Sequence, residues 1–166
     1  TCVSVAIPEP MEDVETPEEI VMALSFEKAW KAAQDPKWNE FVIVGSDTIV
    51  CVDGKKLGKP ENASDAHQML MRLSGRRHQA YTGLALICPS THFKVVSYSV
   101  THVDMGPFSA QTAWDYVKTG EVFGKAGAYA IQGLGATLVE GIQGDFFTVV
   151  GLPVYLLGQL LKRHSL

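Results

Sequence analysis

Helical and strand-forming patterns alternate along this chain, with no internal repeat and no low-complexity linker between them. This alternation is typical of an α/β domain, in which helices cover the faces of a central sheet. A chain of 166 residues with 46% hydrophobic and 19% charged residues has the length and the apolar content to bury one core. We therefore predict a single α/β domain over residues 1–166, built on a mixed sheet of parallel and antiparallel strands.

Four segments have the start, stop or spacing signals of helices. Thr16 and Glu19 form the pattern of a capping box, and Pro36 ends the helix that follows near residue 34. Apolar residues recur at helical spacing over residues 66–73, where Gly75 is placed to end the helix. Two further helices are expected, one over residues 109–120 with Ser109 as its cap and one after Pro153.

Strand signals lie between these helices. Residues 41–44 and 49–52 are rich in β-branched side chains, with residues 45–48 between them as a strand end or bend and Asp53-Gly54 as a hairpin turn. Residues 81–88 and 95–103 are expected to form neighbouring antiparallel strands, joined through the turn at residues 89–91. A last strand is predicted over residues 146–150.

Charge and cysteine content exclude several classes of protein. The 14 basic and 18 acidic residues give a net charge of −4 without a basic block, which argues against nucleic-acid or anionic-membrane partners. Cys2, Cys51 and Cys88 have neither disulfide-framework nor zinc-ligand spacing, so a reducing, cytoplasmic setting fits best. Apolar runs fall short of the ~20 residues of a membrane helix, and we expect no membrane association.

Asp47 is the first candidate for chemistry, because it lies between two strongly apolar β segments. A carboxylate in such surroundings requires a metal, a cation or hydrogen bonds to offset its desolvation. Alternatively, Asp47 caps a turn through its own side chain, as Asx turns do. Thr48 next to it positions a ligand or favours β structure. Both alternatives stay open for each residue.

Three lysines are candidates for binding an anion. Lys28 shares the apolar face of the first helix, so its ammonium group either extends to solvent or meets an anion. Lys59 and Lys125 each follow a glycine, which lets backbone amides approach a phosphate, although Gly-Lys also occurs in ordinary exposed turns. The chain contains no GxxxxGK[ST] loop and no GxGxxG after a strand.

The segment of residues 124–135 is too rich in glycine for a stable helix and too apolar for a disordered linker. We interpret it as a packed loop that closes over a ligand. Gln132 in this loop either reads the edge of a base or is a buried amide bonded to the backbone. Nucleophilic acyl chemistry is disfavoured, because Ser46 lacks a nucleophile-elbow sequence and the histidines are scattered.

Taken together, six segments resemble the Maf family over nearly the whole chain. These are Gly-Ser-Asp-Thr-Ile-Val at 45–50, Gly-Lys-Pro at 58–60, Leu-Ser-Gly-Arg at 73–76, Tyr-Thr-Gly at 81–83, and the 124–135 loop followed by Val-Val-Gly-Leu-Pro at 149–153. The resemblance implies an elongated α/β structure with a cleft between two lobes, similar to the inosine triphosphate pyrophosphatases. It also implies hydrolysis of nucleoside triphosphates to monophosphate and pyrophosphate, with Mg²⁺, Mn²⁺ or Co²⁺ as the divalent cofactor.

The resemblance assigns roles to particular residues. The 124–127 and 131–133 segments are similar to the branch that acts on dTTP, UTP and modified pyrimidine nucleotides. On this basis Asp47 is the general base and a metal ligand, and Thr48 and Gln132 contribute to substrate selection. Phosphate contacts fall to the lysines already named, Lys28, Lys59 and Lys125. Glu9 matches an acidic residue of the substrate site, with Glu12 as a competing match, and a homodimer is expected.

One part of the family pattern has no match here. Family members begin with a strand and a Ser-x-x-Arg-Arg loop that binds phosphate, and nothing similar precedes Val3. We therefore expect this sequence to lack that strand and loop. The alternative to an enzyme is a non-catalytic nucleotide-binding regulator linked to cell division.

Overall fold

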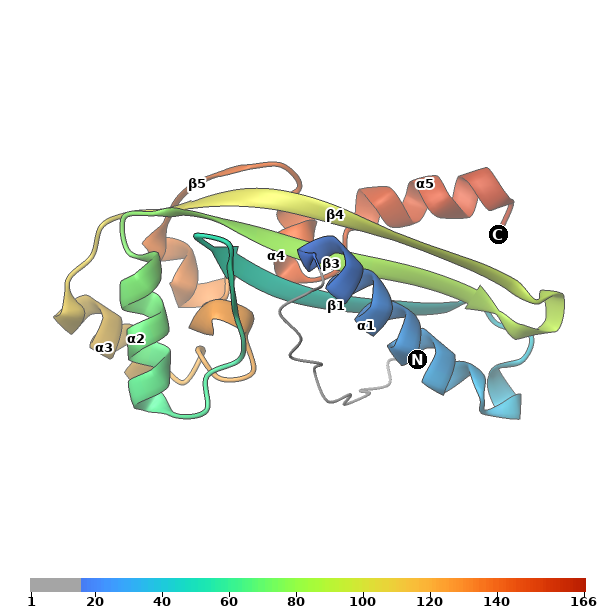
Figure 1. The fold of residues 1–166 in the computed structure, drawn as a ribbon, viewed down its shortest axis with the longest axis horizontal. Helices are drawn as coiled ribbons and strands as arrows, with labels where there is room; N and C mark the ends of the chain where they lie inside the picture. The colour runs from blue at the N-terminus through green and yellow to red at the C-terminus, as the bar shows by residue number, and fades with distance from the viewer. Residues whose placement is uncertain (1–15) are drawn as a thin grey trace.

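The computed structural model describes residues 16–166, which contain a five-stranded sheet in the order β2-β1-β3-β4-β5 (Figure 1). The strands are β1 (Ile43–Val52), β2 (Lys55–Leu57), β3 (Arg77–Cys88), β4 (Phe93–Met105) and β5 (Val139–Gln143). Every strand pairing among the described residues is antiparallel, so the expected parallel pairs do not occur there. Short turns join β1 to β2 and β3 to β4, and such turns reverse the direction of the chain.

Two layers of helices enclose the sheet (Figure 1). Helix α1 (Pro17–Ala33) packs on one face against β1 and β3. Short α4 (Phe146–Val150) and α5 (Val154–His164) lie on the other face, where Leu84 and Leu86 of β3 pack against Leu160. Helices α2 (Ala63–Leu73) and α3 (Ala110–Lys118) pack together at one end of the sheet over the largest core cluster. In the described part of the chain, no helix combines the length and the apolar character of a membrane span.

The helix signals of the sequence are confirmed. The Thr16 hydroxyl accepts a hydrogen bond from the backbone N–H of Glu19 at 3.3 Å, and Glu19 accepts one from the Thr16 N–H at 2.9 Å, which completes the capping box. Ser109 caps α3 and α5 follows Pro153, both as expected, while the cap of α2 is Asn62, which the sequence analysis did not single out. The β3–β4 hairpin turns at Pro89–Thr91, where the sequence predicted it.

The predicted break at residues 45–48 is wrong, because β1 continues through it without interruption. Asp47 pairs with Gly83 of β3 in the middle of the strand. Gly45 in this segment serves close packing, because an added Cβ would lie 2.2 Å from the carbonyl oxygen of Ser25 in α1. Glycine therefore lets α1 approach the sheet closely at this position.

The predicted strand over residues 146–150 is also wrong, because this segment forms α4. A short apolar run has no periodicity that separates a strand from a buried helical turn. The local signal that decides is Asp145, whose side chain caps the helix by accepting from the N–H of Thr148 at 2.9 Å. Gly151, at a φ of 113°, ends it. The last strand is β5, earlier in the chain.

Candidate functional site

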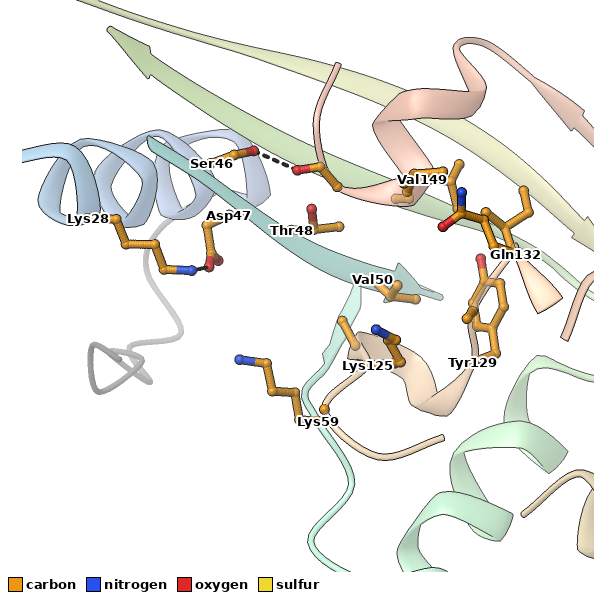
Figure 2. Close-up of a pocket in the computed structure, with 17 residues that line it drawn as sticks. Lys28, Ser46, Asp47, Thr48, Val50, Lys59, Lys125, Tyr129, Gln132 and Val149 are labelled. Atoms are coloured by element: carbon orange, nitrogen blue, oxygen red, sulfur yellow. Dashed lines mark hydrogen bonds and ion pairs between the residues drawn. The ribbon is translucent and has the colours of Figure 1, made fainter. Parts of the chain in front are cut away.

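A pocket of about 250 Å³ opens between β1, the 124–135 loop and the C-terminal end of α4 (Figure 2). It brings together six of the residues predicted from the sequence, which are Lys28, Asp47, Thr48, Lys59, Lys125 and Gln132. Glu9, and Glu12 that competes with it, lie outside the described residues. The six come from four segments that are far apart in the chain, namely α1, β1, the loop with Lys59 and the 124–135 loop, and the fold brings these segments together.

Asp47 and Lys28 form an ion pair at one end of the pocket (Figure 2). Alternation along β1 points Asp47 toward α1, which carries Lys28 on its facing side. The side chain of Asp47 is only 10% exposed and that of Lys28 only 24%, so solvent screens this ion pair weakly. Asp47 therefore does not cap a turn, and Lys28 meets an anion instead of extending into solvent.

Lys59 and Lys125 are exposed, and the ammonium group of neither forms a hydrogen bond or ion pair with any residue from 16 to 166. A backbone hydrogen bond of 3.0 Å from the N–H of Gly127 to the carbonyl of Gly58 ties their two loops together. Figure 2 shows both ammonium groups on the side of β1 where the Asp47 carboxylate lies. Two ammonium groups beside a pocket, with no partner in the part of the chain that the structure describes, favour an anionic ligand there.

On the opposite side of β1, Thr48 belongs to a chain of hydroxyl groups. Its Oγ1 lies 2.8 Å from Oγ1 of Thr82, which in turn donates to the carbonyl of Thr148 in α4 at 2.6 Å. Ser46 reaches the same segment, because its hydroxyl lies 2.8 Å from the carbonyl of Gly151. These bonds fix α4 and the following turn against the sheet. Sequence reasoning assigned no role to Thr82 or Thr148.

Gln132 lies at the other end of the pocket, near Val149 and Tyr129 (Figure 2). Its side chain is exposed, so the alternative of a buried amide bonded to the backbone is wrong. Tyr129 is buried below it, with its hydroxyl 2.8 Å from Nε2 of His78. Burial lowers the pKa of His78 to about 4, so this histidine is neutral at pH 7. His78 also escaped the sequence analysis, which found only scattered histidines.

The 124–135 loop is packed, as predicted, and Glu121 holds its far end. One carboxylate oxygen of Glu121 accepts from the N–H of Leu134 at 3.1 Å and the other accepts from the N–H of Gly135 at 3.2 Å. These backbone donors lower the pKa of Glu121, the Leu134 amide most of all. The Tyr116 hydroxyl accepts from the N–H of Ala130 at 3.1 Å, which fixes the middle of the loop.

We expect Glu121→Gln to raise KM for the pocket's ligand about three- to tenfold while kcat changes less, because one backbone N–H then faces an amide that cannot accept. Steady-state kinetics and limited proteolysis of the loop measure the effect. Glu140→Gln is the matched control, since this exposed carboxylate of β5 has no hydrogen bond or ion pair within residues 16–166. Equal KM values for the two variants would contradict the role of Glu121.

The residues of the pocket are compatible with a divalent cation bound together with an anionic ligand. Among residues 16–166, Asp47 is the single acidic residue that lines the pocket, and no cluster of three metal-ligating side chains occurs in that range. Mg²⁺ commonly binds through one or two carboxylates, several waters and the phosphates of a substrate. The donor set therefore suits a metal that shares Asp47 with phosphate oxygens.

An antiparallel sheet enclosed by helices, with lysines around one carboxylate, defines an α/β protein whose pocket suits a phosphorylated ligand. The chain belongs to the Maf family, because the sequence profile of Maf-like proteins matches residues 1–164.

Curated relatives in three bacteria are each described as a dTTP/UTP pyrophosphatase. The protein of Clostridioides difficile (strain 630) is 50% identical over 150 residues, which are 90% of this chain and 76% of the relative. That of Caldanaerobacter subterraneus is 46% identical over 156 residues, covering 94% of this chain and 75% of the relative. The protein of Symbiobacterium thermophilum is 42% identical over 164 residues, covering 97% and 82% respectively.

Proposed function

We propose that this chain is a metal-dependent nucleoside triphosphate pyrophosphatase that hydrolyses dTTP and UTP to the monophosphate and pyrophosphate. The observation that carries the proposal is the pocket in which one carboxylate, three lysines and an exposed amide converge. The three relatives support the same activity, since each is described as a dTTP/UTP pyrophosphatase.

The pocket's charges match the needs of cleavage between the α- and β-phosphates. Lys59 and Lys125 bind the phosphate chain and stabilise the negative charge that gathers on the departing pyrophosphate. Lys28 leaves Asp47 for a phosphate oxygen when the nucleotide binds, which frees the carboxylate to accept a proton. A divalent cation, held by Asp47 and the phosphates, would neutralise charge and increase the acidity of water.

Asp47 then acts as the general base. It accepts a proton from the water whose oxygen attacks the α-phosphorus, and the bond from that phosphorus to the bridging oxygen breaks. The bridging oxygen leaves with pyrophosphate, and the monophosphate retains the new oxygen. Gln132 is at the far end of the pocket, where its donor and acceptor pair can contact the base.

The proposal also covers the likeness of the fold to a known class of enzymes and its division into two lobes. We infer a structure like that of the inosine triphosphate pyrophosphatases, with the pocket as the cleft between two lobes. Support comes from the lining, which combines β1 and Lys28 of α1 with the loops that carry Lys59 and Lys125 next to the α2–α3 end.

We expect the purified full-length protein to release pyrophosphate from dTTP and UTP in the presence of Mg²⁺ or Mn²⁺, with less turnover of GTP. A coupled assay that separates pyrophosphate from orthophosphate measures the first product. Orthophosphate as the first product would contradict cleavage between the α- and β-phosphates. Tight binding of UTP without hydrolysis in metal-replete protein would favour the nucleotide-binding regulator instead.

A further inference from the structure

The hydroxyl chain behind the pocket has a fixed direction. A threonine hydroxyl has one proton, and a carbonyl oxygen can only accept. Since Thr82 donates its proton to the carbonyl of Thr148 at 2.6 Å, it has none left for Thr48. The 2.8 Å contact between the two hydroxyl oxygens therefore requires Thr48 to be the donor.

The direction of donation, from Thr48 to Thr82 and from Thr82 to the carbonyl of Thr148, is fixed by the surroundings of Thr82 and of Thr148. Thr82 is fully buried, so no solvent molecule replaces its partner. Thr148 is held in turn, because its N–H and its hydroxyl both reach the carboxylate of Asp145 at 2.9 Å and its hydroxyl lies 2.8 Å from that of Ser99. The carbonyl that accepts from Thr82 is thus fixed in place.

Thr48 therefore offers the pocket only lone pairs. Its proton points inward to Thr82, while Thr48 itself lines the cavity. Figure 2 shows its hydroxyl on the side of β1 that faces Val149 and Gln132, across the strand from the ammonium groups of Lys59 and Lys125. A substrate group that meets Thr48 must bring its own proton, and it lies on the base side of the nucleotide.

Building on the proposed function, we propose that Thr48 accepts a hydrogen bond from N3–H of uracil or thymine, and that Thr82 enforces this choice by keeping the Thr48 proton. N3–H is the one N–H donor that these two bases retain in a nucleotide. Cytosine places an unprotonated nitrogen at the same position, so its lone pair would face the lone pairs of Thr48. The hydroxyl chain thus selects dTTP and UTP against CTP.

The test compares kcat/KM for UTP and CTP in four proteins. The wild type is expected to prefer UTP by about tenfold or more, because a site built around a hydrogen bond rejects a ligand that cannot form it. Thr82→Val releases the Thr48 proton, which can then be donated to cytosine, so the rate with CTP rises and the preference falls about tenfold. Thr82→Ser keeps the hydroxyl group that bonds to Thr48, so the preference for UTP over CTP is expected to stay. Thr48→Val removes the hydroxyl and lowers the preference without raising the rate with CTP.

Several results would overturn the proposal. A wild type that hydrolyses UTP and CTP equally well removes the selection while leaving the proposed function intact. If Thr82→Val lowers kcat/KM for UTP and for CTP by the same factor, Thr82 only supports α4 and does not select the base. Circular dichroism shows whether Thr82→Val folds. If it does not, the Thr48→Val variant decides: an unchanged preference for UTP over CTP in that variant would overturn the proposal.

A second arm separates the base from the sugar. We expect dTTP and 2′,3′-dideoxy-TTP to bind wild type and Thr48→Val with an unchanged ratio of Kd values in titration calorimetry, which needs no turnover. A ratio that collapses in Thr48→Val would place Thr48 on the 3′-hydroxyl and overturn the assignment to N3–H. Binding of UTP no tighter than CTP by wild type would overturn the proposal even in a protein without hydrolysis.

Discussion

Asp47→Asn is expected to reduce kcat for UTP about 10²–10⁴-fold, which is the range for loss of a positioned acid or base. Asparagine keeps the shape of the side chain but cannot accept a proton from water at neutral pH. The fold should survive, because Lys28 is 24% exposed and can be hydrated when its partner is neutral. Pyrophosphate release and thermal melting by circular dichroism measure the two effects.

Asp53→Asn is the matched control for this change. Asp53 is an exposed residue of the β1–β2 turn that pairs with Arg76 on the surface. Its φ of 50° is a conformation that asparagine tolerates. Turnover near the wild-type rate in Asp47→Asn would reject Asp47 as the base, whereas a large loss in Asp53→Asn would show that the assay responds to general damage.

The second large effect is expected from Gly83→Ala, which should lower the free energy of unfolding by about 3 kcal/mol. An added Cβ would lie 2.0 Å from the carbonyl oxygen of Val21 and 2.4 Å from its carbonyl carbon, both in the backbone of α1. No side chain can rotate away from this clash, so α1 must move off the sheet. For a chain of this length the loss corresponds to a melting temperature lower by about 6–12 °C.

Gly158→Ala provides the opposite expectation within the same protein. Gly158 lies inside α5, and an added Cβ there meets no atom within 4 Å. Alanine in a helix interior is more favourable than glycine, so the variant should gain about 0.5–1 kcal/mol. Urea denaturation of both variants measures the difference. A Gly83→Ala protein as stable as Gly158→Ala would mean that α1 does not depend on the close approach.

The helices could be predicted from the sequence because their signals are local. Thr16 and Glu19 are three residues apart, and their capping box needs nothing from the rest of the chain. The strand β1 could not be predicted as continuous, because the reason for Gly45 inside it is a helix that lies about twenty residues earlier in the sequence. Likewise, the five residues of α4, four of them apolar, gave no period to distinguish helix from strand.

The candidate site shows the same limit. Asp47 stood out because it interrupts an apolar stretch, and the lysines stood out beside glycines, yet nothing in the sequence indicated that Lys28 and Asp47 form a pair. Thr82 and His78 lie in a strand-forming segment whose composition explains them equally well as β residues. Their importance depends on Thr148 and Tyr129, which the fold alone brings to them.

Adjacent residues of β1 divide the site between its two faces. Asp47 points to α1 and Thr48 points to α4, since successive side chains of a strand alternate. Under the proposed assignments, one peptide bond separates the group that moves a proton from the group that reads the base. An engineer who wants a different nucleobase specificity would therefore redesign the layer behind Thr48 and leave the layer behind Asp47 untouched.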